Sequence, residues 1–94
     1  MTKSRKIKAL GDYNKAVEIN PDNYQTYHNR GILFIQTGKY ENALKDFDAC
    51  LEKYPNFVWA MEKRAEVLGK LGRHREAQRD LNKAKELMKL WHKM

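Results

Sequence analysis

Residues 24–57 read YQTYHNRGILFIQTGKYENALKDFDACLEKYPNF, and apolar residues recur at helical spacing in two parts of this stretch. The first part covers residues 24–37 and the second covers residues 40–53. Gly38 stands between them, and glycine readily takes the left-handed conformation that ends a helix. The stretch therefore predicts two antiparallel helices joined by a tight turn.

The pattern of this stretch recurs along the chain at an interval of 34 residues. Gly72 follows Gly38 by one interval, and Pro21 precedes Pro55 by one interval. Four further positions recur three times each: Ala9, Ala43 and Ala77; Tyr13, Phe47 and Leu81; Ala16, Cys50 and Ala84; and Asp12, Asp46 and Asp80. A fixed period of this length is typical of a solenoid, in which repeated helix pairs stack on one another.

The period predicts an all-α solenoid that forms a single domain over residues 1–94. Prolines 21 and 55 mark the joints between repeats, because proline disfavours helix in the residue before it. We expect five helices, at residues 5–19, 24–37, 40–53, 58–71 and 74–92. The domain then consists of a lone second helix of a partial repeat (5–22), a first full repeat (24–57) and a second full repeat with an extended final helix (58–92).

Small and large apolar residues alternate in a way that predicts how the helices pack. Small side chains allow facing helices to approach closely, and we expect this at Ala43, Cys50, Ala77 and Ala84. We expect the space between helix pairs to be filled by Phe34, Phe47, Leu68 and Leu81.

The composition limits the class of protein. A chain of 94 residues suffices for one domain with a modest core. Cys50 is the only cysteine, which excludes an intrachain disulfide and favours an intracellular, cytoplasmic protein. The sequence has no run of about 18 apolar residues, so we expect no membrane-spanning helix.

No motif in the sequence points to catalysis. We find no nucleophile elbow, no glycine-rich phosphate loop and no zinc-binding His-Glu-x-x-His element. The three histidines lack the one-turn spacing of a metal-binding pair, and Cys50 takes the place of an alanine in the other registers. We therefore expect no enzymatic activity, no cofactor and no metal site.

These residues resemble the tetratricopeptide repeat family, whose unit is a helix pair of 34 residues. The first full repeat matches through Tyr27, Gly31, Phe34, Gly38, Tyr40, Ala43, Phe47 and Pro55. The second matches through Met61, Ala65, Leu68, Gly72, Ala77, Leu81 and Ala84, and the leading segment matches through Ala9, Tyr13, Ala16 and Pro21. The departures are Arg30 and Arg64, where the family usually has leucine, and Lys89 in place of the closing proline.

The resemblance implies a protein–protein interaction module or scaffold, in which successive first helices line a concave groove for a peptide or a partner helix. The residues implied on this groove are Gln25, His28, Asn29, Ile32, Gln36, Trp59, Glu62, Lys63, Glu66 and Lys70. Trp59 is the strongest candidate, because exposed tryptophan is enriched at interaction hot spots; the alternative is that it packs against the loop near Pro55 and Phe57. A carboxylate clamp for chaperone tails fits only at Asn29 and Lys63, so we do not favour it.

Two further kinds of partner stay open at this point. The terminal helices carry apolar residues that a solenoid would cover, which predicts a homo-oligomer formed through Ile7, Leu10, Leu87, Leu90 and Trp91. The alternative is that the chain is an excised or engineered piece of a longer solenoid. The net charge of +7 also allows binding of nucleic acid (RNA), but Glu76, Asp80 and Glu86 interrupt the basic residues of the last helix and make this the less favoured function.

Overall fold

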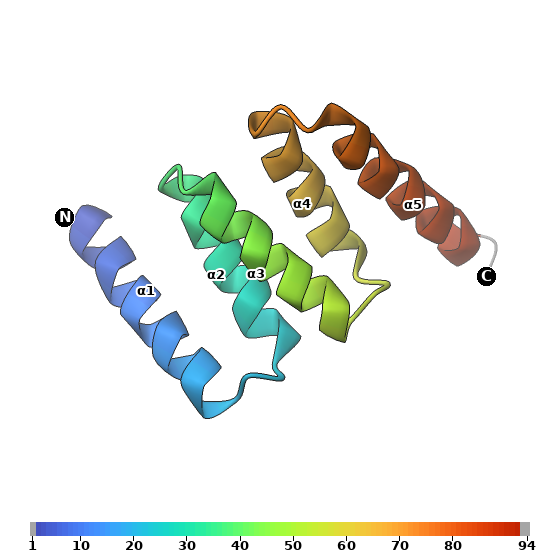
Figure 1. Ribbon diagram of the computed structural model, residues 1–94. Coiled ribbons are helices and arrows are strands. Elements are labelled where there is room, and N and C mark those ends of the chain that lie inside the picture. Colours follow the sequence, from blue (N-terminus) through green and yellow to red (C-terminus); the bar gives the residue numbers. More distant parts are fainter. Residues whose placement is uncertain (1, 93–94) are drawn as a thin grey trace.

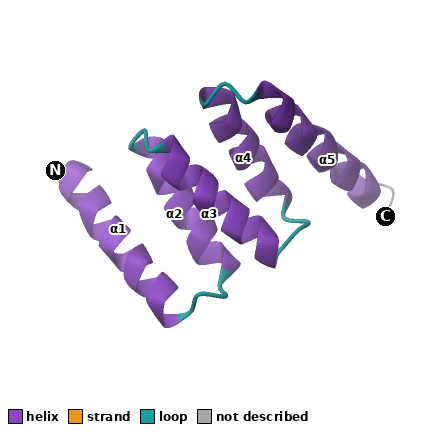
Figure 2. Cartoon of the chain, viewed as in Figure 1, coloured by secondary structure: helices purple, strands orange, loops and turns teal. Residues whose placement is uncertain are grey.

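A computed structural model describes residues 2–92 of the chain as five helices. In chain order they are α1 (Thr2–Ile19), α2 (Tyr24–Gln36), α3 (Tyr40–Lys53), α4 (Val58–Lys70) and α5 (His74–His92). Short loops connect them, and the described part of the chain contains no strand (Figure 2). The all-α prediction is confirmed; Met1, Lys93 and Met94 of the expected domain lie outside the described residues.

The helices differ from their expected limits by a few residues. The first helix begins at Thr2 rather than at residue 5, and both α2 and α4 end one residue early. The cause of the early ends is the turn that follows, where Gly38 and Gly72 have φ of 75° and 78°. At the first turn, the Lys39 N–H donates to the Phe34 carbonyl at 2.8 Å, and this bond satisfies a carbonyl that the helix end leaves free.

The helices stack side by side in chain order, and each runs antiparallel to the next (Figure 1). The pairs α2–α3 and α4–α5 repeat the same arrangement, and α1 lies beside α2 at one end of the stack. The first helices of the two pairs, α2 and α4, also contact one another. The result is an elongated molecule of 43 × 29 × 21 Å.

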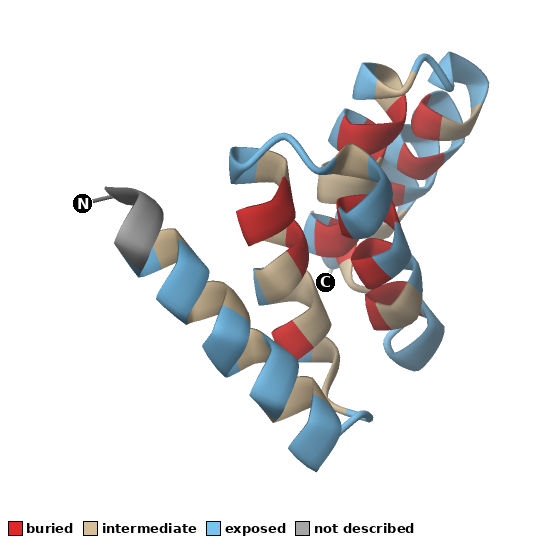
Figure 3. Cartoon of the chain, turned by 60° about the vertical axis from the view of Figure 1, so that its left-hand side comes forward, coloured by how far each residue is buried: buried red, intermediate tan, exposed pale blue. Residues whose placement is uncertain are grey.

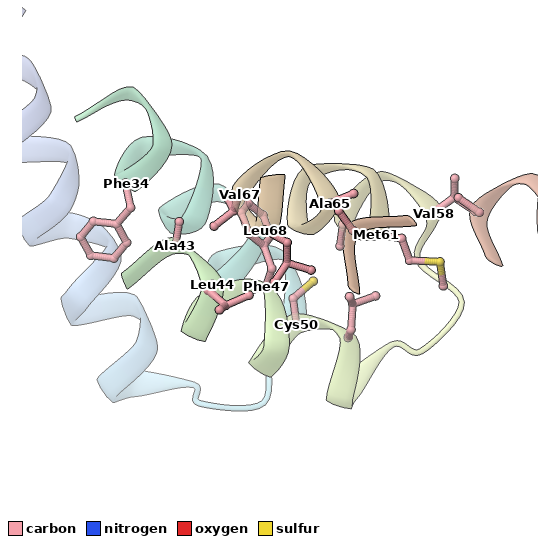
Figure 4. Packing of buried hydrophobic residues seen from close by; sticks show 14 residues of the cluster. Phe34, Ala43, Leu44, Phe47, Cys50, Val58, Met61, Ala65, Val67 and Leu68 are labelled. Atoms are coloured by element: carbon pink, nitrogen blue, oxygen red, sulfur yellow. The ribbon is translucent and has the colours of Figure 1, made fainter. Parts of the chain in front are cut away.

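The centre of the core lies where α3 meets α2 and α4 (Figure 4). Phe47, Cys50, Met61 and Val67 are the largest side chains that are fully buried. Gly31 of α2 is required at this place, because a Cβ atom on it would lie 2.8 Å from the ring of Phe47. The small residues expected between helices, Ala43, Cys50, Ala77 and Ala84, are all buried.

Both ends of the stack are less buried than its centre. Residues 5–19 of α1 contain no buried residue, as Figure 3 shows by the absence of red along this helix. The expectation that Leu81 fills space between helix pairs is wrong, because its side chain is 39% exposed. Leu81 stands one repeat after Phe47, at the equivalent position. The following helix, α4, helps to cover Phe47, but among the described residues no helix follows α5 to cover Leu81.

Candidate functional site

The residues predicted for a binding groove lie on α2 and α4, the two helices that form one side of the stack. Trp59 is 68% exposed, so most of its indole is available to a partner. Its ring also lies 5.9 Å from the ring of Phe57, so the alternative position against the loop is partly observed as well. Trp59 is thus a largely exposed aromatic side chain that packs beside Phe57.

An aromatic cluster that the sequence pattern did not predict supports Trp59. Tyr24 packs edge-on against Tyr54 at 5.0 Å and against Phe57 at 5.4 Å between ring centroids, and Tyr54 stacks on Phe57. The cluster joins the start of α2 to the loop between α3 and α4. No periodic signal marks it, because its members come from loops and helix ends.

His28 of α2 lies against the inner side of this cluster. Its ring is 4.9 Å from Phe57 and 5.9 Å from Phe47, and its Nε2 atom is buried without a hydrogen-bond partner. Burial lowers the pKa of His28, a hydrogen bond with Asn29 opposes this, and the positive charge of Lys63 adds to the lowering, so the pKa lies below its ordinary value. Near neutral pH, His28 therefore adds an uncharged ring to the face rather than a cation.

The remaining predicted residues of α4 give the face charges of both signs. Lys63 and Glu66 form an ion pair at 3.6 Å, and Glu62 and Lys70 are exposed. Exposed pairs of this kind contribute little to stability, commonly less than about 1 kcal/mol. Their charges can therefore be rearranged toward a partner at small cost.

The predicted residues of α2 face a hollow that involves α1 as well. Asn29, Ile32 and Gln36 line a space of about 320 Å³ together with residues of α1, among them Ala9 and Tyr13. Ala9 and Tyr13 hold the registers of Ala43 and Phe47, which are completely buried. No described helix covers α1 in the same way, so the face extends onto α1, where the sequence pattern predicted no site residue.

The two arginines that depart from the family pattern act as links between helices. The Arg30 guanidinium donates to both carboxylate oxygens of Asp46, at 2.9 and 2.7 Å, and to Asn14 at 3.0 Å. One register later, Arg64 donates to both oxygens of Asp80 at 2.8 and 2.7 Å and to Asp48 at 3.1 Å. Each arginine thus connects three successive helices, and the acidic partner raises the pKa of each guanidinium further.

The structure adds three findings on other kinds of site. Within the described residues, no group of three or more His, Cys, Asp or Glu side chains could hold a metal ion. None of the described helices combines the length and the apolar character that crossing a membrane requires. Cys50 is buried, and this burial raises its thiol pKa to about 11.

Helix pairs, glycine turns and arginine–aspartate links that recur every 34 residues define a helical-repeat solenoid. Residues 24–57 match the model of the tetratricopeptide repeat. The chain belongs to the tetratricopeptide repeat family.

Three curated relatives are similar in sequence to this chain. It is 36% identical over 69 residues to the tetratricopeptide repeat and J domain-containing co-chaperone DNJ1 of Cryptococcus neoformans var. grubii. It is 37% identical over 75 residues to DnaJ homolog subfamily C member 3, and 37% identical over 68 residues to mitochondrial import receptor subunit TOM70, both of Rattus norvegicus. These matches cover 73, 80 and 72% of this chain but only 13, 15 and 11% of the relatives.

Solved structures share the fold. One crystal structure of MamA superimposes with a TM-score of 0.91 at 19% identity, over 99% of this chain and 54% of that chain. A second MamA structure gives a TM-score of 0.86 at 26% identity, over 94% of this chain and 48% of that chain. Family and fold together support a protein–protein interaction module.

Proposed function

We propose that the chain captures a peptide or protein segment on the face of α2 and α4, without covalent chemistry. The observation that carries this proposal is Trp59, a largely exposed indole that stands beside a packed aromatic cluster. A side chain of this kind gives a partner a large contact area and loses little rotamer freedom on binding. The names of two relatives, a co-chaperone and an import receptor, agree with a role in contacting other proteins.

The other residues of this face offer a segment both apolar and charged contacts. The uncharged ring of His28 and the side chain of Ile32 are apolar parts of the α2 side, and Lys63 and Glu66 supply both charges on the α4 side. A preformed surface of this type binds with little change in backbone conformation. We extend the proposal to a cytoplasmic location and to a role without catalysis.

To test this proposal, a peptide that binds the whole chain is selected from a random library. Its affinity for the unaltered chain and for variants is then measured by titration. The double variant Trp59→Ala/Lys63→Ala should weaken binding of the selected peptide at least about tenfold, because it removes the aromatic anchor and one charge. A variant on the exposed side of α5, Lys83→Ala, is the control and should bind as the unaltered chain does. Equal affinity for the double variant and the control contradicts a groove on α2 and α4.

We also propose that the chain self-associates through the end of α5. Leu90 and Trp91 are 57 and 58% exposed, and Leu87 is half-buried beside them. Burying this surface in a second copy is favourable, but Lys85 and Lys89 flank it and repel the same residues of the partner. The residues predicted at the other end, Ile7 and Leu10 of α1, differ from these because Leu10 packs against the core, so we limit the proposal to α5.

Sedimentation equilibrium tests self-association at two salt concentrations. Added salt screens the lysines, so the dimer fraction should rise with salt, and Leu90→Lys should abolish the rise. A folded monomer at high micromolar concentration in both salts would exclude this second proposal.

A further inference from the structure

The outer side of the stack, formed by α1 and α3, carries a crevice that recurs in the next register. The first crevice, of about 380 Å³, lies between α1, α2 and α3 around Arg30. The second, of about 320 Å³, lies between α3, α4 and α5 around Arg64. Every residue that lines the first stands 34 positions before a residue that lines the second. The fold thus builds the same hollow twice, at equivalent places in two successive registers.

The two crevices differ in charge at two positions. Asn14 and Asn42 in the first become Asp48 and Glu76 in the second. The second crevice therefore holds three cations and three carboxylates, whereas the first holds three cations and the single carboxylate of Asp46. The formal charge of the first crevice is +2, and that of the second is zero.

The cations of the first crevice are available to a partner. Arg30 is engaged by Asp46, but among the described residues no carboxylate forms an ion pair with Lys39 or Lys45. Both lysines are exposed. In the second crevice, the residue in the register of Lys39 is Arg73, which pairs with Glu76. Arg79, in the register of Lys45, is also exposed and forms no ion pair among the described residues, but the two further carboxylates of the second crevice balance its charge. Of the two crevices, only the first thus has a net positive charge.

An apolar pit adjoins the first crevice and shares Leu10, Phe34 and Lys39 with it. The pit has a volume of about 260 Å³ and lies between the start of α1 and the end of α2. It exists because Lys6 and Thr37 stand where the next register has Tyr40 and Leu71, and those two side chains pack against the core there. The pit is therefore the space that an aromatic ring and a leucine occupy one repeat later.

We propose that this outer surface of α1, α2 and α3 binds an acidic protein segment that carries a bulky apolar side chain. The apolar side chain occupies the pit, and flanking carboxylates contact Lys39 and Lys45. The end of α5 of a second copy is disfavoured as the occupant, because lysines 85 and 89 beside Leu90 and Trp91 would repel Lys39 and Lys45. The inference goes beyond the proposed function, since neither the pit nor the crevice contains Trp59 or Lys63.

Fluorescence anisotropy with the whole chain tests the proposal. The probe is a short labelled peptide of aspartates and glutamates with one central phenylalanine. Its binding should be saturable, and replacing the phenylalanine by alanine should weaken it about tenfold, because the pit then stays empty. Equal binding of both peptides would mean attraction by charge alone and would overturn the proposal, as would the absence of saturable binding.

Two variants copy the second register into the first and so keep the fold. Thr37→Leu fills the pit as Leu71 does, and Asn14→Asp/Asn42→Glu neutralises the crevice as Asp48 and Glu76 do. Each should weaken the probe about tenfold without loss of stability in urea, since the same side chains already fit at the equivalent place. Unchanged binding in both variants would overturn the proposal.

The double variant Trp59→Ala/Lys63→Ala is the control that separates the two sides of the stack. It should bind the acidic probe within about twofold of the unaltered chain, because the pit and crevice are intact in it. If this double variant loses as much affinity for the probe as Thr37→Leu does, the probe binds on the α2–α4 face and the proposal is overturned. Binding of a labelled single-stranded RNA is measured in the same way. If Thr37→Leu and Asn14→Asp/Asn42→Glu weaken RNA binding as strongly as they weaken peptide binding, the proposal is overturned in favour of nucleic acid.

Discussion

Gly31 shows how one residue determines the distance between two helices. Its backbone faces the buried ring of Phe47 without a side chain between them, and a Cβ there would lie 2.8 Å from that ring. One register later, Ala65 carries a Cβ, and the residue in the register of Phe47 is Leu81, which is smaller and partly exposed. The small residue is therefore matched to the large aromatic opposite it.

The first prediction concerns Gly31→Ala. Alanine favours helix over glycine by up to about 1 kcal/mol, but overpacking a filled core costs about 1–3 kcal/mol. We expect a net loss of about 1 kcal/mol in the free energy of unfolding, measured by urea denaturation. Gly69→Ala in α4 is the matched control, because nothing lies within 4 Å of the place that a Cβ would take there. It should leave stability unchanged or raise it; a stabilised Gly31→Ala variant would contradict the packing described for Phe47.

At the scale of the helix, the arginine links explain how α1 is attached. Arg30 reaches Asn14 of α1 from α2 while it holds Asp46 of α3 by two hydrogen bonds. The side chains of Arg30 and Asp46 are 19 and 5% exposed, so water weakens this ion pair much less than the pair of Lys63 and Glu66. The hydrogen bond to Asn14 adds to the packing of Leu10 against the core, and α1 has no fully buried residue among its described side chains.

The second prediction is therefore made for the partner of Arg30. Asp46→Ala leaves a guanidinium that is mostly buried without its carboxylate, and breaking such a pair costs about 2–4 kcal/mol. Arg30→Leu combined with Asp46→Ala should recover much of this loss, because no unpaired charge remains. Urea denaturation of the single and double variants measures both effects. Glu66→Ala, which breaks an exposed ion pair, is the control. If Asp46→Ala lowers the free energy of unfolding as little as this control does, the Arg30 link contributes little to stability.

The helices and turns could be predicted from the sequence, whereas the links between helices could not. The apolar spacing within each helix and the glycines at positions 38 and 72 are local signals, and the period of 34 residues repeats them, so together they suffice to predict five helices and their turns. The arginine links join residues 16 positions apart on different helices, and from the sequence Arg30 and Arg64 stood out only as departures from the family pattern. The recurrence of Arg, Asp and Asn/Asp at the same interval was present in the sequence, but only the stacked helices show that these side chains meet.

Only part of the candidate site could be predicted from the sequence, because the rest depends on contacts between elements. Helical phase places Trp59 and Lys63 on one side of α4, and the structure has both at least partly exposed there. The aromatic cluster behind Trp59 comes from loop and helix-end residues without a period, so no pattern indicated it. The participation of α1 in the same face depends on which helices remain uncovered, and that is a property of the assembled stack.

At the scale of the whole molecule, burial falls from the centre to both ends. The side chains with at most 1% exposure are Ala43, Phe47, Cys50, Ala60, Met61 and Val67, and all of these belong to α3 and α4. In a stack, each helix is stabilised only by its neighbours, so helices with one neighbour open more easily than helices with two. The middle of the chain should therefore be the last part to unfold.

The third prediction follows from this gradient. Amide hydrogen exchange should be slowest in α3 and α4 and fastest in α1, because α1 can open without exposing the central core. Cys50 gives an independent measure, since its thiol is buried and its pKa is raised to about 11. A thiol reagent should modify Cys50 only at the rate at which α3 opens. In the folded chain the reagent cannot reach the sulfur atom, and the raised pKa keeps the thiol protonated and therefore unreactive. Exchange in α1 as slow as in α3, or modification of Cys50 much faster than exchange in α3, would mean that the stack opens at its centre rather than at its ends.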